Sequence, residues 1–248
     1  MKKNVLYRQV RAHLKSIEKY LSAYSKVAKP RYLHQIRLDI KITKALFSFA
    51  KDLSKESYNT TDLKEIFQKS GEIREIQVMI KLLNSSHVIP EKLIDQLEKK
   101  EKNLKNQFLK NSSRHITIIK NFRKRVSFPI IVLDKETIQS YFETELIKAG
   151  QIFQNNNREG LHQFRKSIKK LMFVYEVLPK KIKKEVVLNK RQINKLQEKV
   201  GNWHDTYSAI DFLSTHYFSK IPDDFLSKLK EKEQRKLEAL FSESYHFC

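Results

Sequence analysis

The sequence has 248 residues, of which 50 are Lys or Arg and 28 are Asp or Glu, so its formal net charge is +22. Hydrophobic residues make up 40% of the chain, which is enough for a buried core and too many for general disorder. Only four Gly and five Pro are present, which disfavours a many-stranded fold, and a single cysteine, Cys248, excludes an intramolecular disulfide or a cysteine-based zinc site within one chain.

Helical periodicity dominates the chain. Breaks fall at residues that commonly end or precede helices, among them Pro30, Pro90, Pro129 and Pro179. The sequence therefore predicts an all-α fold. The expected helices span residues 4–27, 31–54, 61–84, 90–126, 135–156, 159–178, 181–200, 203–218 and 222–246.

The excess of positive charge favours a polyanionic partner, because a chain with this charge repels itself when it folds. Nucleic acid, an anionic membrane and a phosphate polymer are the candidates, and a solvated Lys-rich surface without a partner is the alternative. No stretch approaches the roughly 18 apolar residues of a membrane-spanning helix. No signal peptide is visible before Arg8 and Arg11. We therefore expect a cytoplasmic protein without a membrane span.

Two segments of the first half recur in the same order in the second half. Residues 33–41 (LHQIRLDIK) match residues 161–169 (LHQFRKSIK), and residues 69–75 (KSGEIRE) match residues 199–205 (KVGNWHD). Two matched segments at nearly the same offset are hard to obtain by chance. We therefore expect a duplicated helical bundle. The first repeat would span residues 1–128 and the second residues 129–248.

A row of basic side chains lies along the first matched helix, within about one quarter of its circumference at 100° per residue. Apolar residues flank the row on both sides, unlike in a simple solvated charge run. Gln35, Asp39 and Thr43 on the opposite face are left for solvent. The row consists of His34, Arg37, Lys41 and Lys44, and its second copy consists of His162, Arg165, Lys166, Lys169 and Lys170.

Burying these cations without a partner would be costly, so they need carboxylates, a water-filled groove or an anionic ligand. Pairing of Arg37 with Glu75 and of Arg165 with Asp205 would make the arginines structural, and this alternative stays open. It leaves the lysines unexplained, because too few repeated acids are present. A groove open to phosphate fits better, since Arg offers a planar fork to phosphate oxygens and Lys a mobile point charge.

Catalysis finds little support in the sequence. No Gly-rich phosphate loop, paired-carboxylate motif or Ser/His/Asp pattern stands out, so we expect a protein that is not an enzyme. His34 and His162 have cations as helical neighbours, which would repel a divalent ion. We therefore expect no metal and no other cofactor.

These motifs resemble the CHAD family, the conserved-histidine α-helical domains. The signature helix of that family carries His, then Arg three positions on, then basic residues seven, eight and ten positions on. The first copy departs from this pattern at Ile42 and the second at Met172. The family's later Gly-x-x-Arg/Asn-Asp element is similar to residues 71–75 and 201–205. Here the first copy ends in Glu, and the second has His before its Asp.

The resemblance implies two pseudo-symmetric four-helix bundles around a basic cavity. It also implies binding of inorganic polyphosphate by the nine basic residues of the two rows, and often association with polyphosphate granules. Nucleic-acid binding, through the basic residues 123–125 and 180–184, is the alternative function. A scaffolding protein that recruits an acidic segment to the same groove is another.

Overall fold

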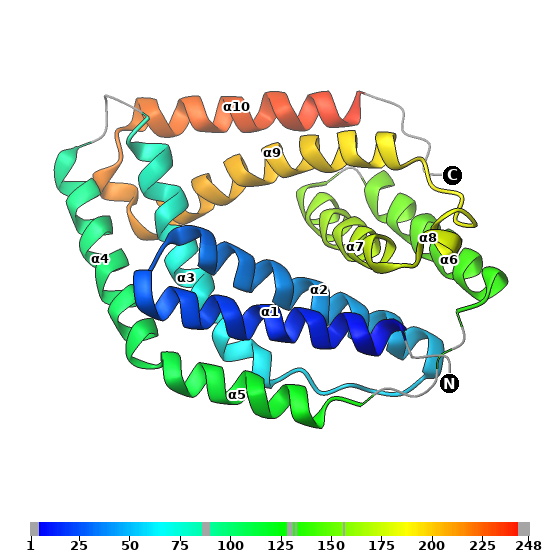
Figure 1. The fold of residues 1–248 in the computed structure, drawn as a ribbon. Helices are drawn as coiled ribbons and strands as arrows, with labels where there is room; N and C mark the ends of the chain where they lie inside the picture. The colour runs from blue at the N-terminus through cyan, green and yellow to red at the C-terminus, as the bar shows by residue number, and fades with distance from the viewer. Residues whose placement is uncertain (1–4, 86–89, 128–130, 132, 156, 243–248) are drawn as a thin grey trace. The chain divides into compact units, whose positions relative to one another are not determined.

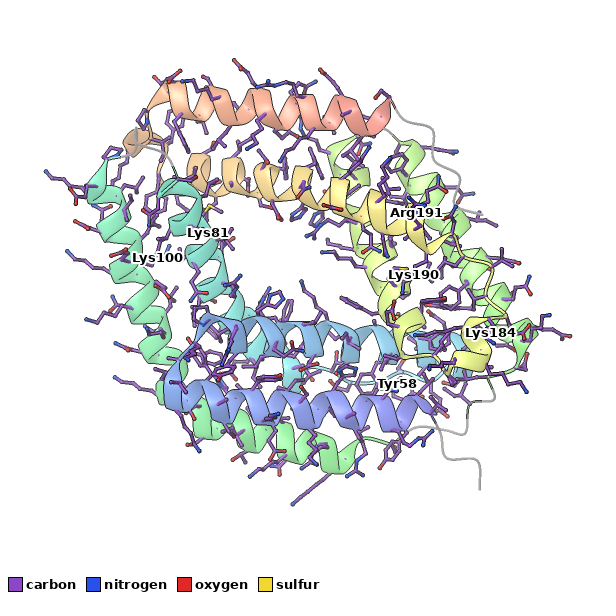
Figure 2. All side chains as sticks on the ribbon, turned by 45° about the horizontal axis from the view of Figure 1, so that its top comes forward. Tyr58, Lys81, Lys100, Lys184, Lys190 and Arg191 are labelled. Carbon is purple, nitrogen blue, oxygen red and sulfur yellow. The ribbon has the colours of Figure 1, made fainter. Side chains whose placement is uncertain are left out.

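The computed structural model describes residues 5–85, 90–127, 131, 133–155 and 157–242 of the chain (Figure 1). Their regular secondary structure is helical, and no strand occurs among them, which confirms the all-α prediction. No helix in these ranges is both long and apolar enough to cross a membrane.

The chain divides into two compact units. The first comprises Met1–Ser85, Ile94–Val132 and Glu176–Leu178. The second comprises Ser86–Leu93, Leu133–Tyr175 and Pro179–Cys248.

Five helices account for the first unit. In Figure 1, α1 lies beside α2, and α5 packs against α1 and α3. The facing sides of these helices bury aliphatic residues such as Leu14, Ile17 and Leu46, which are fully shielded from solvent. The helices are α1 (Val5–Val27), α2 (Pro30–Ser54), α3 (Asp62–Leu83), α4 (Glu91–Lys110) and α5 (Ser112–Arg125).

The back of α2 differs from the sequence-based expectation. Asp39 and Thr43 were predicted to face solvent, but both are buried, with 2% and 0% of their surface exposed. The prediction was wrong because α1 covers this face and supplies polar partners for the carboxylate. His13 Nδ1 lies 2.9 Å from Asp39 Oδ1, and the Ser16 hydroxyl donates to Asp39 Oδ2 at 2.6 Å.

The single helix predicted for residues 90–126 is in fact two helices, α4 and α5, which meet at Asn111. The amide nitrogen of the Asn111 side chain donates to the main-chain carbonyl of Gln107 at 2.9 Å. Asparagine side chains compete in this way with backbone hydrogen bonds, which explains why the helix ends here. Beyond the break, the His115 ring lies 4.8 Å from the Phe108 ring and is 1% exposed.

The second unit begins where Asp134 caps α6, its carboxylate accepting the backbone N–H of Thr137 at 2.8 Å. In Figure 1, α9 and α10 of this unit lie side by side. Its elements are α6 (Lys135–Gln154), α7 (Arg158–Val177), α8 (Lys180–Lys183), α9 (Lys190–His216), the 3₁₀-helix η1 (Phe218–Lys220) and α10 (Asp223–Phe241).

Residues 181–218 form different helices from those predicted. A break was expected between residues 200 and 203, but α9 runs through Gly201 and Asn202 without interruption. Helical continuity here is fixed by Trp203, whose side chain is completely buried. The start of α9 is also later than predicted, because Asn189 caps it by accepting the backbone N–H of Gln192 at 3.1 Å.

A buried carboxylate joins α7, α9 and α10. Glu233 on α10 is 4% exposed and accepts two hydrogen bonds from Arg158, at 3.0 and 2.8 Å. The indole N–H of Trp203 donates to the same carboxylate at 2.6 Å. Every donor aimed at Glu233 would lose its acceptor if the carboxylate were removed.

We expect Glu233→Ala to lower the free energy of unfolding by about 2 kcal/mol, because it leaves the buried Trp203 donor unsatisfied. Lys228→Ala removes an ion pair with Asp224 on the same helix, and both of its side chains are more than 60% exposed. This control should change stability by less than about 0.5 kcal/mol. Urea denaturation followed by circular dichroism measures both effects, and equal losses in the two variants would contradict the assignment.

Candidate functional site

The basic row of the first unit lies where α2 meets α3. Arg37 of α2 contacts Phe67 of α3, and Lys44 lies near Lys64, so the two helices run in opposite directions. Arg74 of α3 lies close enough to His34 and Arg37 to lower the pKa of both. We call His34, Arg37, Lys41, Lys44 and Arg74 the first basic cluster.

Phe67 is the centre around which three of these cations gather. The Arg37 guanidinium carbon lies 4.2 Å from the ring centroid, Lys44 Nζ 5.1 Å and Lys41 Nζ 6.0 Å. Arg37 Nη1 also donates to the main-chain carbonyl of Phe67. The electron-rich face of an aromatic ring attracts cations, so Phe67 offsets part of the cost of bringing three positive charges together.

Gly71 leaves room for the Arg37 guanidinium against the backbone of α3. A methyl group at this position would overlap Arg37 Nη1 and would lie 3.2 Å from Cζ. The glycine of the second matched segment, Gly201, has no neighbour within 4 Å of the corresponding methyl position. The first glycine is therefore needed for the placement of an arginine, and the second is not.

The predicted pairing of Arg37 with Glu75 is not formed. Arg37 makes no ion pair within 4.0 Å with Glu75 in the described part of the chain, and the Glu75 side chain is exposed. Burial lowers the pKa of Arg37, the charge of Arg74 lowers it further, and Glu75 opposes these effects. Arginine nevertheless stays protonated at ordinary pH, so the first basic cluster keeps a net positive charge.

In the second unit, the basic row lies where α7 meets α9. His162 Nδ1 and His204 Nε2 lie 2.9 Å apart, and the two rings are stacked with centroids 4.9 Å apart. Burial lowers the pKa of His162, and the charge of Lys166 lowers it further, which places Lys166 near the pair. We call His162, Arg165, Lys166, Lys169 and His204 the second basic cluster.

Arg165 is held loosely in this cluster. Its side chain is 18% exposed, and the nearest Asp205 oxygen lies 4.0 Å from Nη2, at the limit of an ion pair. The buried Nε of Arg165 has no hydrogen-bond partner. Burial lowers the pKa of Lys169, Arg165 lowers it further, and Asp205 opposes them. The pairing of Arg165 with Asp205 therefore exists, but it leaves part of the guanidinium unsatisfied.

Lys170 lies apart from the other predicted site residues. Its ammonium group is 3.2 Å from Glu145 of α6, and the same carboxylate is 3.1 Å from Lys148. Burial raises the pKa of Glu145, but the hydrogen bonds and charges of both lysines lower it more, so the net shift is downward. Lys170 thus forms an ion pair between α6 and α7.

Sequence reasoning missed three contributors, Phe67, Arg74 and His204. Arg74 and His204 occupy equivalent positions of the second matched segment, which was noticed but not assigned to the site. Only this repetition, next to the glycine, could have pointed to them. No group of three His, Cys, Asp or Glu side chains suited to a metal ion occurs among the described residues.

Comparisons with known proteins agree with this architecture. The family model of the CHAD domain matches residues 8–214. The crystal structure of the CHAD domain from the plant Ricinus communis has a TM-score of 0.62 at 14% sequence identity, covering 96% of this chain and 86% of that one. A comparison with curated proteins found no match.

We expect Gly71→Ala to displace the Arg37 guanidinium and to weaken polyanion binding by about tenfold, the loss of roughly one charge-assisted hydrogen bond. The fold should survive, because the overlapping atom is the end of a flexible side chain. Gly201→Ala is the matched control, and it should leave binding unchanged while adding about 0.5–1 kcal/mol of helix stability. Fluorescence titration with long-chain polyphosphate measures both variants, and similar affinities would refute the role of Gly71.

Proposed function

This chain belongs to the CHAD domain family, and we propose from this membership and from its two basic clusters that it binds inorganic polyphosphate. Each cluster presents a guanidinium and neighbouring ammonium groups, the donors that phosphate oxygens prefer. Binding without turnover is proposed, since the clusters offer positive charge and hydrogen-bond donors. Association with polyphosphate granules would follow from such binding.

The observation that carries the proposal is the state of the two arginines. Arg37 and Arg165 are largely buried, yet neither forms a two-point ion pair with a carboxylate. Elsewhere the protein does build such pairs, as between Arg114 and Glu65, whose two hydrogen bonds measure 3.0 and 2.9 Å. Buried cations without full partners are costly, and a bound phosphate would supply the missing acceptors.

Nucleic acid remains the alternative ligand, but the observations favour it less. Two cations of the basic segment 123–125 are paired, since Arg123 lies 3.1 Å from Glu18 and Arg125 lies 2.6 Å from Asp62. The Phe67 ring is surrounded by cations, so it is a poor platform for base stacking. A polymer of phosphate alone needs no such platform.

The double variant Arg37→Ala with Arg165→Ala should weaken polyphosphate binding by at least about 100-fold, because each arginine supplies hydrogen bonds worth roughly 1.5–3 kcal/mol to a charged ligand. Circular dichroism should show unchanged helicity. Arg114→Ala with Arg235→Ala removes the same formal charge from two exposed positions, one in each unit, and serves as the control. It should bind within about threefold of the parent, as expected for surface charges.

Isothermal titration at physiological salt, with single-stranded and duplex DNA as competitors, measures these affinities. DNA should displace polyphosphate only at far higher phosphate concentration. Equal affinity of the two double variants would mean that general electrostatics accounts for binding, and ready displacement by DNA would favour the nucleic-acid alternative.

A further inference from the structure

The two basic clusters differ at one corresponding position. His34 has Arg74 as its neighbour in the first cluster, whereas His162 has His204 in the second. Arg74 is permanently protonated, but the pair of His162 and His204 can exist in more than one protonation state. The charge of the second cluster therefore depends on how many protons this imidazole pair holds.

The geometry of the pair limits how many protons it takes up. A separation of 2.9 Å between His162 Nδ1 and His204 Nε2 is a hydrogen bond, which needs a proton on one nitrogen and a lone pair on the other. One additional proton, on a nitrogen outside the bond, leaves this arrangement intact and makes the hydrogen bond charge-assisted. A second would put protons on both facing nitrogens and break it. The pair is thus suited to gaining a single positive charge.

The surroundings oppose that charge while no anion is bound. Burial lowers the pKa of His162, Lys166, His204 and Arg165 lower it further, and Glu159 opposes them. On the other side of the pair, Asp205 Oδ1 lies 3.9 Å from His204 Nδ1, and the Ser208 hydroxyl lies 3.2 Å from the same nitrogen. The charged groups around the pair are Glu159, Arg165, Lys166 and Lys169 on α7, Asp205 on α9 and Lys236 on α10.

We infer that the His162–His204 pair makes the second basic cluster a proton-linked anion site, which gains a proton when the anion binds. The identity of the anion as polyphosphate rests on the proposed function. A bound phosphate adds negative charge beside the pair and offsets the cations that repel the extra proton. Proton and anion then stabilise each other's binding, as thermodynamic linkage requires.

The sign of the pH dependence follows from this linkage. The anion-bound state holds the extra proton more tightly than the free state, so the pKa of the pair is higher when the anion is bound. Affinity therefore rises as the pH falls through the interval between the two pKa values, and it is independent of pH above that interval. Long-chain polyphosphate is a suitable probe, because its internal phosphates remain ionised throughout this range.

The first experiment follows the imidazoles directly in the full-length protein by ¹⁵N NMR, with and without saturating long-chain polyphosphate. His162→Gln and His204→Gln assign the signals of the pair. We expect the His162 pKa in the free protein to lie below its ordinary value of 6.5, and the pKa of the pair to rise when polyphosphate is added. An unchanged titration at saturation would overturn the inference.

The second experiment compares affinities at pH 6 and pH 8. The parent should bind about three- to tenfold more tightly at pH 6, because uptake of one proton changes affinity by at most tenfold per pH unit. His204→Arg reproduces the first cluster's His–Arg arrangement, and it should bind more tightly than the parent at pH 8 and gain less at pH 6. His216→Arg, at an exposed position of the same helix, is the matched control and should keep the parent's pH dependence. An unchanged pH dependence in His204→Arg would overturn the inference.

Inorganic sulfate separates failure of this inference from failure of the proposed function. If polyphosphate does not bind at either pH but sulfate raises the pKa of the pair, the proposed function fails and the proton-linked site stands. If polyphosphate binds without any change in the pair's titration, the function stands and the inference fails. If neither anion binds or moves the titration, both are wrong.

Discussion

The guanidinium of Arg37 lies directly on the backbone of α3, and the chemistry of the first unit depends on this contact. Gly71 leaves the space, and Phe67 supplies a carbonyl oxygen and a ring face. These groups stabilise cations through partial charges only. Lys41 and Lys44 share the same ring, so three cations are held together without a carboxylate that would neutralise them. The cluster is therefore ordered and still positively charged.

The second unit arranges the matching residues differently. Gln197 stands where α3 has Phe67, if the two matched segments are aligned, so no ring gathers the cations of α7. Arg165 instead has a distant carboxylate and an unsatisfied Nε. An imidazole pair replaces the His–Arg neighbours of the first cluster. The correspondence of positions agrees with an internal duplication, which itself stays a prediction, as does the basic cavity expected between two bundles.

Helical periodicity predicted most of the elements and the composition of both rows, because the angle of a residue on its own helix follows from its position alone. It could not show which neighbour covers each face. Asp39 was therefore assigned to solvent although α1 buries it, and Lys170 was assigned to the site although it pairs with Glu145. Phe67 lies outside the matched segments, and only the packing of α3 on α2 brings it to the site. The break at Asn111 depends on a side-chain hydrogen bond that no periodicity reveals.

The buried carboxylate of Asp39 has a consequence for how the front of α2 can change over time. Its hydrogen bonds to His13 and Ser16 lie on the opposite side of the helix from the first basic cluster. Rolling α2 about its axis would break both bonds and leave a charge stranded in the core. The direction in which the front of the helix points is thus fixed from behind. Residues on that front can be exchanged, for a different ligand or a different strength of binding, without changing where their replacements are aimed.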